Sequence, residues 1–177
     1  MNKNEVYNVL LKGLSNGDAA FRIKWAEFCV EHQIKFQELF PLMNQDTRTA
    51  KRFMSFVSDC ACIDSNYIYT ILVELFSFRT QVHTIQIESH FAKFWDLCGL
   101  PPENEAEAIN LLFDWVKDKN SNESVLTHSL SLLNALRLKY PDLTPEFIGT
   151  IESQIGKSYK LFDKKALKIL NTLKDDF

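Results

Sequence analysis

The stretch DTRTAKRFMSFVSDCA, residues 46–61, contains the pattern on which the predicted fold depends. Asp46 and Thr47 begin the stretch and are residue types that cap the N-termini of helices. Its apolar residues then recur three and four positions apart, which is the spacing of one helix face: Ala50, Phe53, Met54, Val57 and Ala61. The stretch therefore predicts an amphipathic helix that buries one side against other helices.

The same period extends outward from this helix along the chain. It predicts further helices at residues 3–14, 19–32, 35–43, 66–78, 81–98, 104–118, 126–140, 144–156 and 158–174. Residues 66–78 are rich in β-branched and aromatic residues, which also favour a strand. We predict a helix there because Ile68, Ile71 and Leu75 keep the helical period and a single strand would lack a partner.

The composition also favours an all-α fold. With only 5 Gly and 5 Pro among 177 residues, the chain is poor in the residues that the tight turns of an all-β protein require. Its hydrophobic fraction of 46% is sufficient for a folded core, and we predict a single all-helical domain over residues 1–177. The four cysteines lie in apolar, helix-like segments, so we expect thiols in the core and no disulfides: Cys29, Cys60, Cys62 and Cys98.

Charge and hydropathy limit the classes of partner. The net charge of −3 and the pI of about 5.8 provide no general attraction to phosphate backbones, so we expect nucleic acid to be an unfavourable partner. No stretch approaches the ~20 consecutive apolar residues of a membrane span, and the N-terminal sequence is amphipathic. We therefore expect a cytoplasmic protein without a membrane partner.

The predicted helices can be grouped into successive pairs. The pairs cover residues 18–44, 46–78, 81–118 and 122–156, with an N-terminal helix at 3–14 and a C-terminal capping helix at 158–174. Their starting points are separated by roughly 28 to 41 residues, which is the range of periods found in helical repeats. Each pair alone would leave an apolar face uncovered, and stacking of neighbouring pairs would bury it.

Two nine-residue segments carry a resemblance to a known superfamily. The segments are FRIKWAEFC, residues 21–29, and FDKKALKIL, residues 162–170; each has basic residues, a small alanine and two apolar residues after it. In these features the chain resembles the HEAT/armadillo-like α-solenoid superfamily. The resemblance implies a right-handed stack of antiparallel helix pairs with about ten helices. The alternative is an irregular helical bundle with a similar number of helices, because periodicity alone does not separate the two folds.

The sequence contains no motif that predicts catalysis. It has no GxxxxGK[ST] loop, GxGxxG turn, GxSxG elbow or HExxH helix. Cys60 and Cys62, two positions apart on a helix, point in nearly opposite directions and cannot bind one metal ion together. Cys29 and His32 share a helix face and are the basis for one alternative, a metal-binding helical bundle. We predict no catalytic residue, no cofactor and no metal ligand.

Two features are candidates for partner binding. Lys157, Lys160, Lys164 and Lys168 lie on one side of the last predicted helix, opposite its apolar stripe, with Lys165 nearby. They form either the solvated outer face of a capping helix or a docking strip for an acidic or phosphate-bearing partner. Trp115 belongs, with Ala108 and Leu111, to a second apolar stripe on helix 104–118. That stripe either packs against neighbouring helices or exposes Trp115 as a binding anchor.

These observations favour a non-catalytic helical-repeat interaction module that binds another protein. The first alternative is a nucleic-acid binder similar to the DNA glycosylases of the HEAT-like superfamily, which hold the duplex on a basic concave face. The active-site tryptophan, acid and arginine of those enzymes have no matching positions in this sequence. The sequence predicts neither the identity of the partner nor the oligomeric state.

Overall fold

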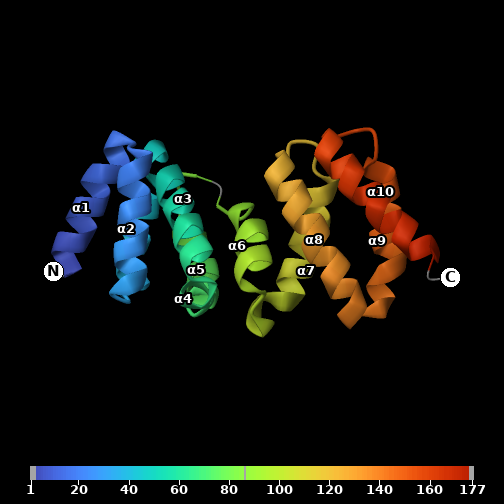
Figure 1. Ribbon diagram of the computed structural model, residues 1–177, viewed down its shortest axis with the longest axis horizontal. Coiled ribbons are helices and arrows are strands. Elements are labelled where there is room, and N and C mark those ends of the chain that lie inside the picture. The colour runs from blue at the N-terminus through green and yellow to red at the C-terminus, as the bar shows by residue number, and fades with distance from the viewer. Residues whose placement is uncertain (1–2, 86, 176–177) are drawn as a thin grey trace. The chain divides into compact units, whose positions relative to one another are not determined.

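The computed structural model describes residues 3–85 and 87–175, which form helices and connecting turns without any β-strand (Figure 1). The predicted all-α fold class is therefore confirmed for the described part of the chain. Residues 1–101 and 102–177 form two compact units, here called the N-terminal and the C-terminal unit. None of the described helices is both long enough and apolar enough to span a membrane.

The helix α3 is central to the N-terminal unit, where it contacts α1, α2, η1, α4 and α6. The carboxylate of Asp46 caps α3 by accepting hydrogen bonds from the backbone N–H groups of Arg48 and Thr49, at 3.0 and 3.2 Å. The elements of the unit, in order, are α1 (Lys3–Asn16), α2 (Ala19–Glu31), the 3-10 helix η1 (Phe36–Asn44), α3 (Thr47–Ile63), α4 (Ser65–Tyr69), α5 (Leu72–Phe78), the 3-10 helix η2 (Arg79–Gln81) and α6 (His90–Cys98).

Aromatic side chains fill the core of the N-terminal unit. The ring of Phe36 lies 5.7 Å from that of Phe53 and 5.8 Å from that of Phe56, measured between centroids. A second group forms where α5 meets α6, with the Phe76 ring 4.9 Å from Phe91 and 5.1 Å from Trp95. All of these side chains are buried. Such rings bury large apolar areas and attract one another in stacked, tilted and edge-to-face arrangements, so they stabilise the packing of these elements.

Three predicted helices of this unit differ in detail from the structure. Residues 35–43 form the 3-10 helix η1, which contains Pro41, a residue that cannot donate a backbone hydrogen bond. Residues 66–78 are helical as predicted, but α4 and α5 divide at Thr70 and Ile71. The predicted helix 81–98 is wrong in its first half, because α6 begins only at His90.

The reason for the late start of α6 lies in contacts with η1. The side chain of Asn44 donates to the carbonyl of Gln81 at 2.9 Å and accepts from the backbone N–H of His83 at 3.2 Å. The hydroxyl of Thr84 donates to the carbonyl of Met43. For Gln81 and His83, these distant partners satisfy backbone groups that a continuous helix would satisfy locally, which agrees with the start of α6 at His90.

The helix α8 is central to the C-terminal unit and packs against α7, α9 and α10. The side chain of Asn122 caps it by accepting from the backbone N–H of Val125 at 3.0 Å. Its buried side chains are mainly leucines: Leu126, Leu130, Leu132, Leu133 and Leu136. The elements are α7 (Pro102–Lys117), α8 (Glu123–Lys139), the 3-10 helix η3 (Pro141–Leu143), α9 (Thr144–Gln154) and α10 (Lys160–Asp175), which agree with the predicted helices to within a few residues.

The boundary between the units falls at Pro101 and Pro102. It lies inside the predicted helix pair 81–118, so that α6 belongs to one unit and α7 to the other. The single domain over residues 1–177, the right-handed solenoid and the alternative irregular bundle stay predictions.

Candidate binding site

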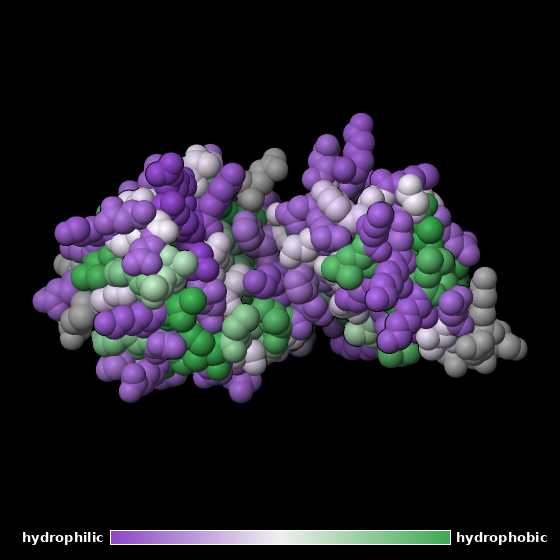
Figure 2. Space-filling view, turned by 45° about the horizontal axis from the view of Figure 1, so that its top comes forward, coloured by the Kyte–Doolittle hydropathy of each residue, from purple (hydrophilic) through white to green (hydrophobic). Residues whose placement is uncertain are grey.

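The four predicted lysines all belong to the C-terminal unit. Lys157 lies in the turn between α9 and α10, and Lys160, Lys164 and Lys168 lie on α10. All four are exposed, while the opposite face of α10 is buried through Phe162, Ala166, Leu170 and Leu173. On the face of this unit shown in Figure 2, most of the surface is hydrophilic and the hydrophobic residues form separate small patches.

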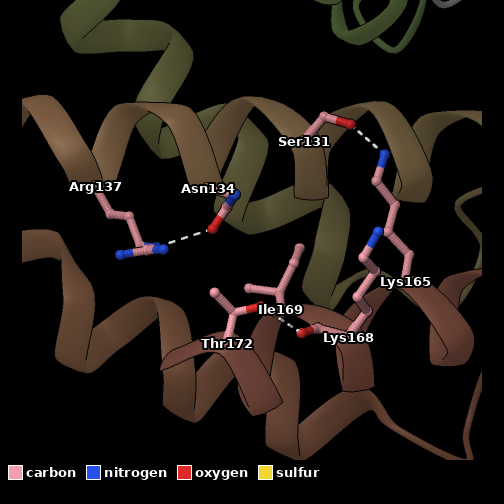
Figure 3. A pocket seen from close by; sticks show the side chains of 7 residues that line it. All are labelled: Ser131, Asn134, Arg137, Lys165, Lys168, Ile169 and Thr172. Carbon is pink, nitrogen blue, oxygen red and sulfur yellow. Dashed lines mark hydrogen bonds between the residues drawn. The ribbon is translucent and has the colours of Figure 1, made fainter. Parts of the chain in front are cut away.

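A cavity of about 390 Å³ lies between α8 and α10 (Figure 3). Its lining combines three cationic side chains, three uncharged polar ones and one apolar one: Arg137, Lys165, Lys168, Ser131, Asn134, Thr172 and Ile169. None of these lining residues is acidic. Of the four predicted lysines, Lys168 lines this cavity, whereas Lys160 and Lys164 do not. The predicted strip is thus divided between a cavity and an open surface.

Arg137 is held on the α8 side of the cavity. Its Nε donates a hydrogen bond to Oδ1 of Asn134 at 2.9 Å, one helical turn earlier. Its guanidinium carbon also lies 6.0 Å from the centroid of the Phe147 ring, which is within cation–π range. Figure 3 shows this pair pointing toward each other on one side of the cavity, opposite the two lysines. The guanidinium is therefore positioned before any ligand arrives.

Lys165 connects α10 to α8 at the other side of the cavity. Its Nζ donates to the backbone carbonyl of Thr127 at 2.9 Å and to the hydroxyl of Ser131. Both acceptors are neutral, so neither compensates the positive charge of Lys165. An ammonium group has three N–H donors, and these bonds use two of them. The third donor remains for a ligand.

Exposed leucines extend the same sides of both helices beyond the cavity. Leu161 is 55% exposed and lies four residues before Lys165, which places both on one side of α10. Leu138 is 70% exposed and lies four residues after Asn134, on the corresponding side of α8. The three cationic side chains and these two leucines are here called the α8–α10 groove.

A second cavity, of about 430 Å³, contains Lys157. It lies where the connection between α7 and α8 meets the connection between α9 and α10, and Lys119 and Tyr159 also line it. Its charge is mixed, because Asp118 is part of the lining and Lys117 is paired with Glu146 at 3.0 Å. Positive charge is therefore less concentrated here than in the α8–α10 groove.

The second predicted feature, the apolar stripe of Ala108, Leu111 and Trp115, is buried or half-buried in the C-terminal unit. Ala108 is fully buried, and Leu111 and Trp115 are half-buried on α7. Trp115 lines neither of the two cavities. Its role as a binding anchor stays a prediction.

The thiols and imidazoles do not form a metal centre in the described part of the chain. Cys29 is fully buried, and this burial raises the pKa of its thiol to about 12. His32 is exposed and stacks on the Phe28 ring at 4.1 Å, with its Nδ1 3.0 Å from the Phe28 carbonyl. Among the described residues, no three His, Cys, Asp or Glu side chains lie close enough together to bind one ion.

Most residues that line the cavity of the α8–α10 groove were not among the candidates from the sequence. Arg137, Asn134 and Ser131 share one side of a helix with mixed polarity, which in isolation is typical of any solvated surface. They become a site only because α8 packs beside α10. The one local signal is the spacing of Asn134 and Arg137, three residues apart, which permits their hydrogen bond.

No protein-family model matches this chain, and neither a curated protein nor a solved structure matches it. The resemblance to the HEAT/armadillo-like superfamily consequently stays an expectation from the sequence. Function is inferred from the geometry of the groove alone.

Proposed function

We propose that the protein is a non-catalytic interaction module whose α8–α10 groove binds an acidic segment of another protein. The observation that carries this proposal is the lining of the cavity: three cationic side chains and no carboxylate, in a chain with a net charge of −3. A local concentration of one charge sign attracts ligands of the opposite sign and raises their rate of association.

The exposed leucines support a protein segment as the ligand. Leu161 and Leu138 can contact apolar side chains on either side of an acidic centre. The stretch of α10 from Leu161 to Thr172 spans about 16 Å at 1.5 Å per residue. An extended peptide covers that distance with about five residues. A short acidic segment flanked by apolar residues therefore fits the groove in charge, polarity and length.

The chemistry of the lining supports binding over catalysis. Protonated Lys and Arg side chains are poor general bases at neutral pH, and the seven lining residues include no His, Asp or Glu that would activate the hydroxyl of Ser131 or Thr172. What these groups do well is to donate charge-assisted hydrogen bonds to oxygen atoms.

The test is a titration of a fluorescein-labelled peptide that has Asp and Glu at its centre and Leu on both sides. We expect its affinity to weaken as salt increases, because exposed charges are screened. The double variant Arg137→Glu/Lys168→Glu should bind at least about 10-fold more weakly, since two attractive contacts become repulsive. Fluorescence anisotropy measures the affinity, and circular dichroism confirms that the variants fold.

The matched control is Lys160→Glu/Lys164→Glu, which changes the net charge equally on a part of α10 outside the cavity. It should retain most of the affinity. Equal losses in both double variants would indicate unspecific attraction and contradict the proposal. Duplex and single-stranded DNA, titrated over the same salt range, address the nucleic-acid alternative: binding tighter than that of the peptide and dependent on Arg137 and Lys168 would favour that alternative instead.

A further inference from the structure

The cavity of the α8–α10 groove has positive charge on both of its sides. Arg137 approaches from α8, and Lys165 and Lys168 approach from α10 (Figure 3). A carboxylate carries one negative charge and two acceptor oxygens, so it can compensate only one of these three cations. A phosphate monoester carries about −1.5 to −2 charges at pH 7 and three acceptor oxygens. The charge and the directions of the donors therefore match a phosphate better than a carboxylate.

Two of the three cationic side chains, Arg137 and Lys165, are also held in place. The bond from Arg137 to Asn134 leaves the two terminal nitrogens of the guanidinium, a planar fork that suits two phosphate oxygens at once. The Lys165 ammonium is fixed by Thr127 and Ser131. Because these protein side chains are ordered before binding, they lose less conformational entropy when a ligand engages them.

The size of the cavity agrees with this class of ligand. Its volume of about 390 Å³ falls within the ~300–1,000 Å³ that is typical of small-ligand pockets. That is room for a tetrahedral phosphate, its first waters and the side chain that carries it. Ile169, the single apolar lining residue, can contact the carbon atoms of that side chain.

We propose that the α8–α10 cavity recognises a phosphorylated serine or threonine of the partner. This inference rests on the proposed function, since it names the group at the centre of the acidic segment. It makes binding conditional on phosphorylation of the partner, because the unmodified hydroxyl brings no charge to compensate the three cations.

The test compares three peptides of identical flanking sequence with Ser, Glu or phosphoserine at the centre. We expect the phosphoserine peptide to bind at least about 10-fold tighter than the Glu peptide, which corresponds to one additional charge-assisted contact. Its affinity should fall between pH 7.5 and 5.5, because the second phosphate pKa is near 6. Over this range the Glu peptide should change little, because its carboxylate titrates at lower pH.

Variants connect the preference to the cavity. Arg137→Gln and Lys168→Gln should each reduce the phosphoserine preference several-fold, whereas Lys164→Gln, outside the cavity, should leave it unchanged. Arg137→Lys keeps the charge but loses the fork and should fall between Arg137→Gln and the unchanged protein. Nuclear magnetic resonance shifts of α8 and α10 amides verify that the peptide occupies this groove.

The outcomes separate this inference from the proposed function. Equal binding of the Glu and phosphoserine peptides, with loss in the Arg137 and Lys168 variants, overturns phosphate recognition and leaves the acidic-segment proposal standing. Binding of no peptide overturns both. If free phosphoserine or inorganic phosphate binds as tightly as the peptide, the assignment to a protein partner is overturned. If a single-stranded oligonucleotide displaces the phosphopeptide at equal concentration, the assignment is overturned in favour of phosphodiesters.

Discussion

The two units build their cores from different side chains. In the N-terminal unit, η1 meets α3 and α5 meets α6 through phenylalanine and tryptophan rings whose centroids lie 4.9 to 5.8 Å apart. In the C-terminal unit, α8 presents a row of leucines to its neighbours. Large rings can bridge short and irregular elements such as η1 and α4, while regular leucine faces suit the longer helices α7, α8 and α10.

The units also use their cations differently. In the N-terminal unit, Arg52 donates from Nη1 to the carbonyls of Leu14 and Ser15, both at 2.8 Å, and thereby caps the C-terminus of α1. Arg22 forms an ion pair with Asp59. In the C-terminal unit, Arg137 and Lys165 hydrogen-bond to neutral groups beside a cavity without acidic lining. Ion pairs also join helices of the C-terminal unit, Lys117 with Glu146 and Lys139 with Glu105, so the difference between the units is confined to the cations beside this cavity.

Removing one central ring should give the largest effect and test whether the cores are separate. Phe36→Ala deletes a side chain that is 1% exposed and contacts the rings of Phe53, Phe56 and Tyr67. We expect a loss of about 3–5 kcal/mol of unfolding free energy. Hydrogen exchange should accelerate in α3 amides, and α8 amides should keep their protection. Equal acceleration in α8 would show that the two cores unfold as one and would break the comparison.

A second test concerns the close contact between α1 and α2. Gly13 is buried, and a Cβ atom there would overlap the ring of Phe21. Gly13→Ala should therefore destabilise the N-terminal unit by about 1–3 kcal/mol, although alanine is the better helix former. The midpoint of urea unfolding measures the change. The double variant Gly13→Ala/Phe21→Ala should recover part of the loss, and a plain stabilisation by Gly13→Ala would refute the overlap.

The regular helices could be predicted from sequence because their signal is local. In α3, α8 and α10 the apolar residues repeat within the helix itself, so the pattern alone identifies the buried face. Residues 82–89 could not be predicted in this way. They follow a helical apolar pattern, but the His83 N–H donates to Asn44 and the Thr84 hydroxyl donates to the Met43 carbonyl, about 40 residues earlier. Local periodicity contains no information about such partners.

The candidate site, like the fold, could be predicted only in those features that belong to a single helix. The exposure of Lys168 follows from its position opposite the apolar stripe of α10. Its neighbour across the cavity, Arg137, is 31 positions earlier in the sequence and reaches it only through the packing of α10 on α8. Charge clusters within one helix are therefore readable from sequence, whereas a cavity lined by two helices requires their tertiary arrangement.

Acid should distinguish the units through their ionisable groups. Burial lowers the pKa of His90 below its ordinary value of 6.5, and Lys93 and Lys51 lower it further. The unfolded chain therefore takes up this proton more readily than the folded one, and the stability of the N-terminal unit should fall as pH drops below about 6.5, by at most about 1.4 kcal/mol per pH unit. Hydrogen exchange in α6 at pH 7.5 and 5.5, corrected for intrinsic rates, measures this loss.

In the C-terminal unit the corresponding group is Glu105 on α7. Hydrogen bonds from Lys139 and Tyr140 lower the pKa of its carboxyl below 4.5. The contribution of Glu105 to the free energy of unfolding is complete above pH 4.5 and is lost only as pH falls through the lower pKa of the folded state.

His90→Gln should flatten the pH dependence of the stability of the N-terminal unit between pH 7.5 and 5.5. An unchanged slope in that variant would assign the acid sensitivity to another group.

The smallest effect should come from the counterpart of Gly13 in the other unit. Gly149 lies in α9, is exposed, and has no atom within 4 Å of the position that a Cβ would take. Gly149→Ala should therefore stabilise the C-terminal unit by about 0.5–1 kcal/mol, because alanine loses less backbone entropy in a helix. The urea midpoint is again the measurement. If the same Gly→Ala substitution lowers the free energy of unfolding in α1 and raises it in α9, packing against Phe21, and not helix propensity, determines the response at Gly13. A loss of stability at Gly149 would remove that distinction.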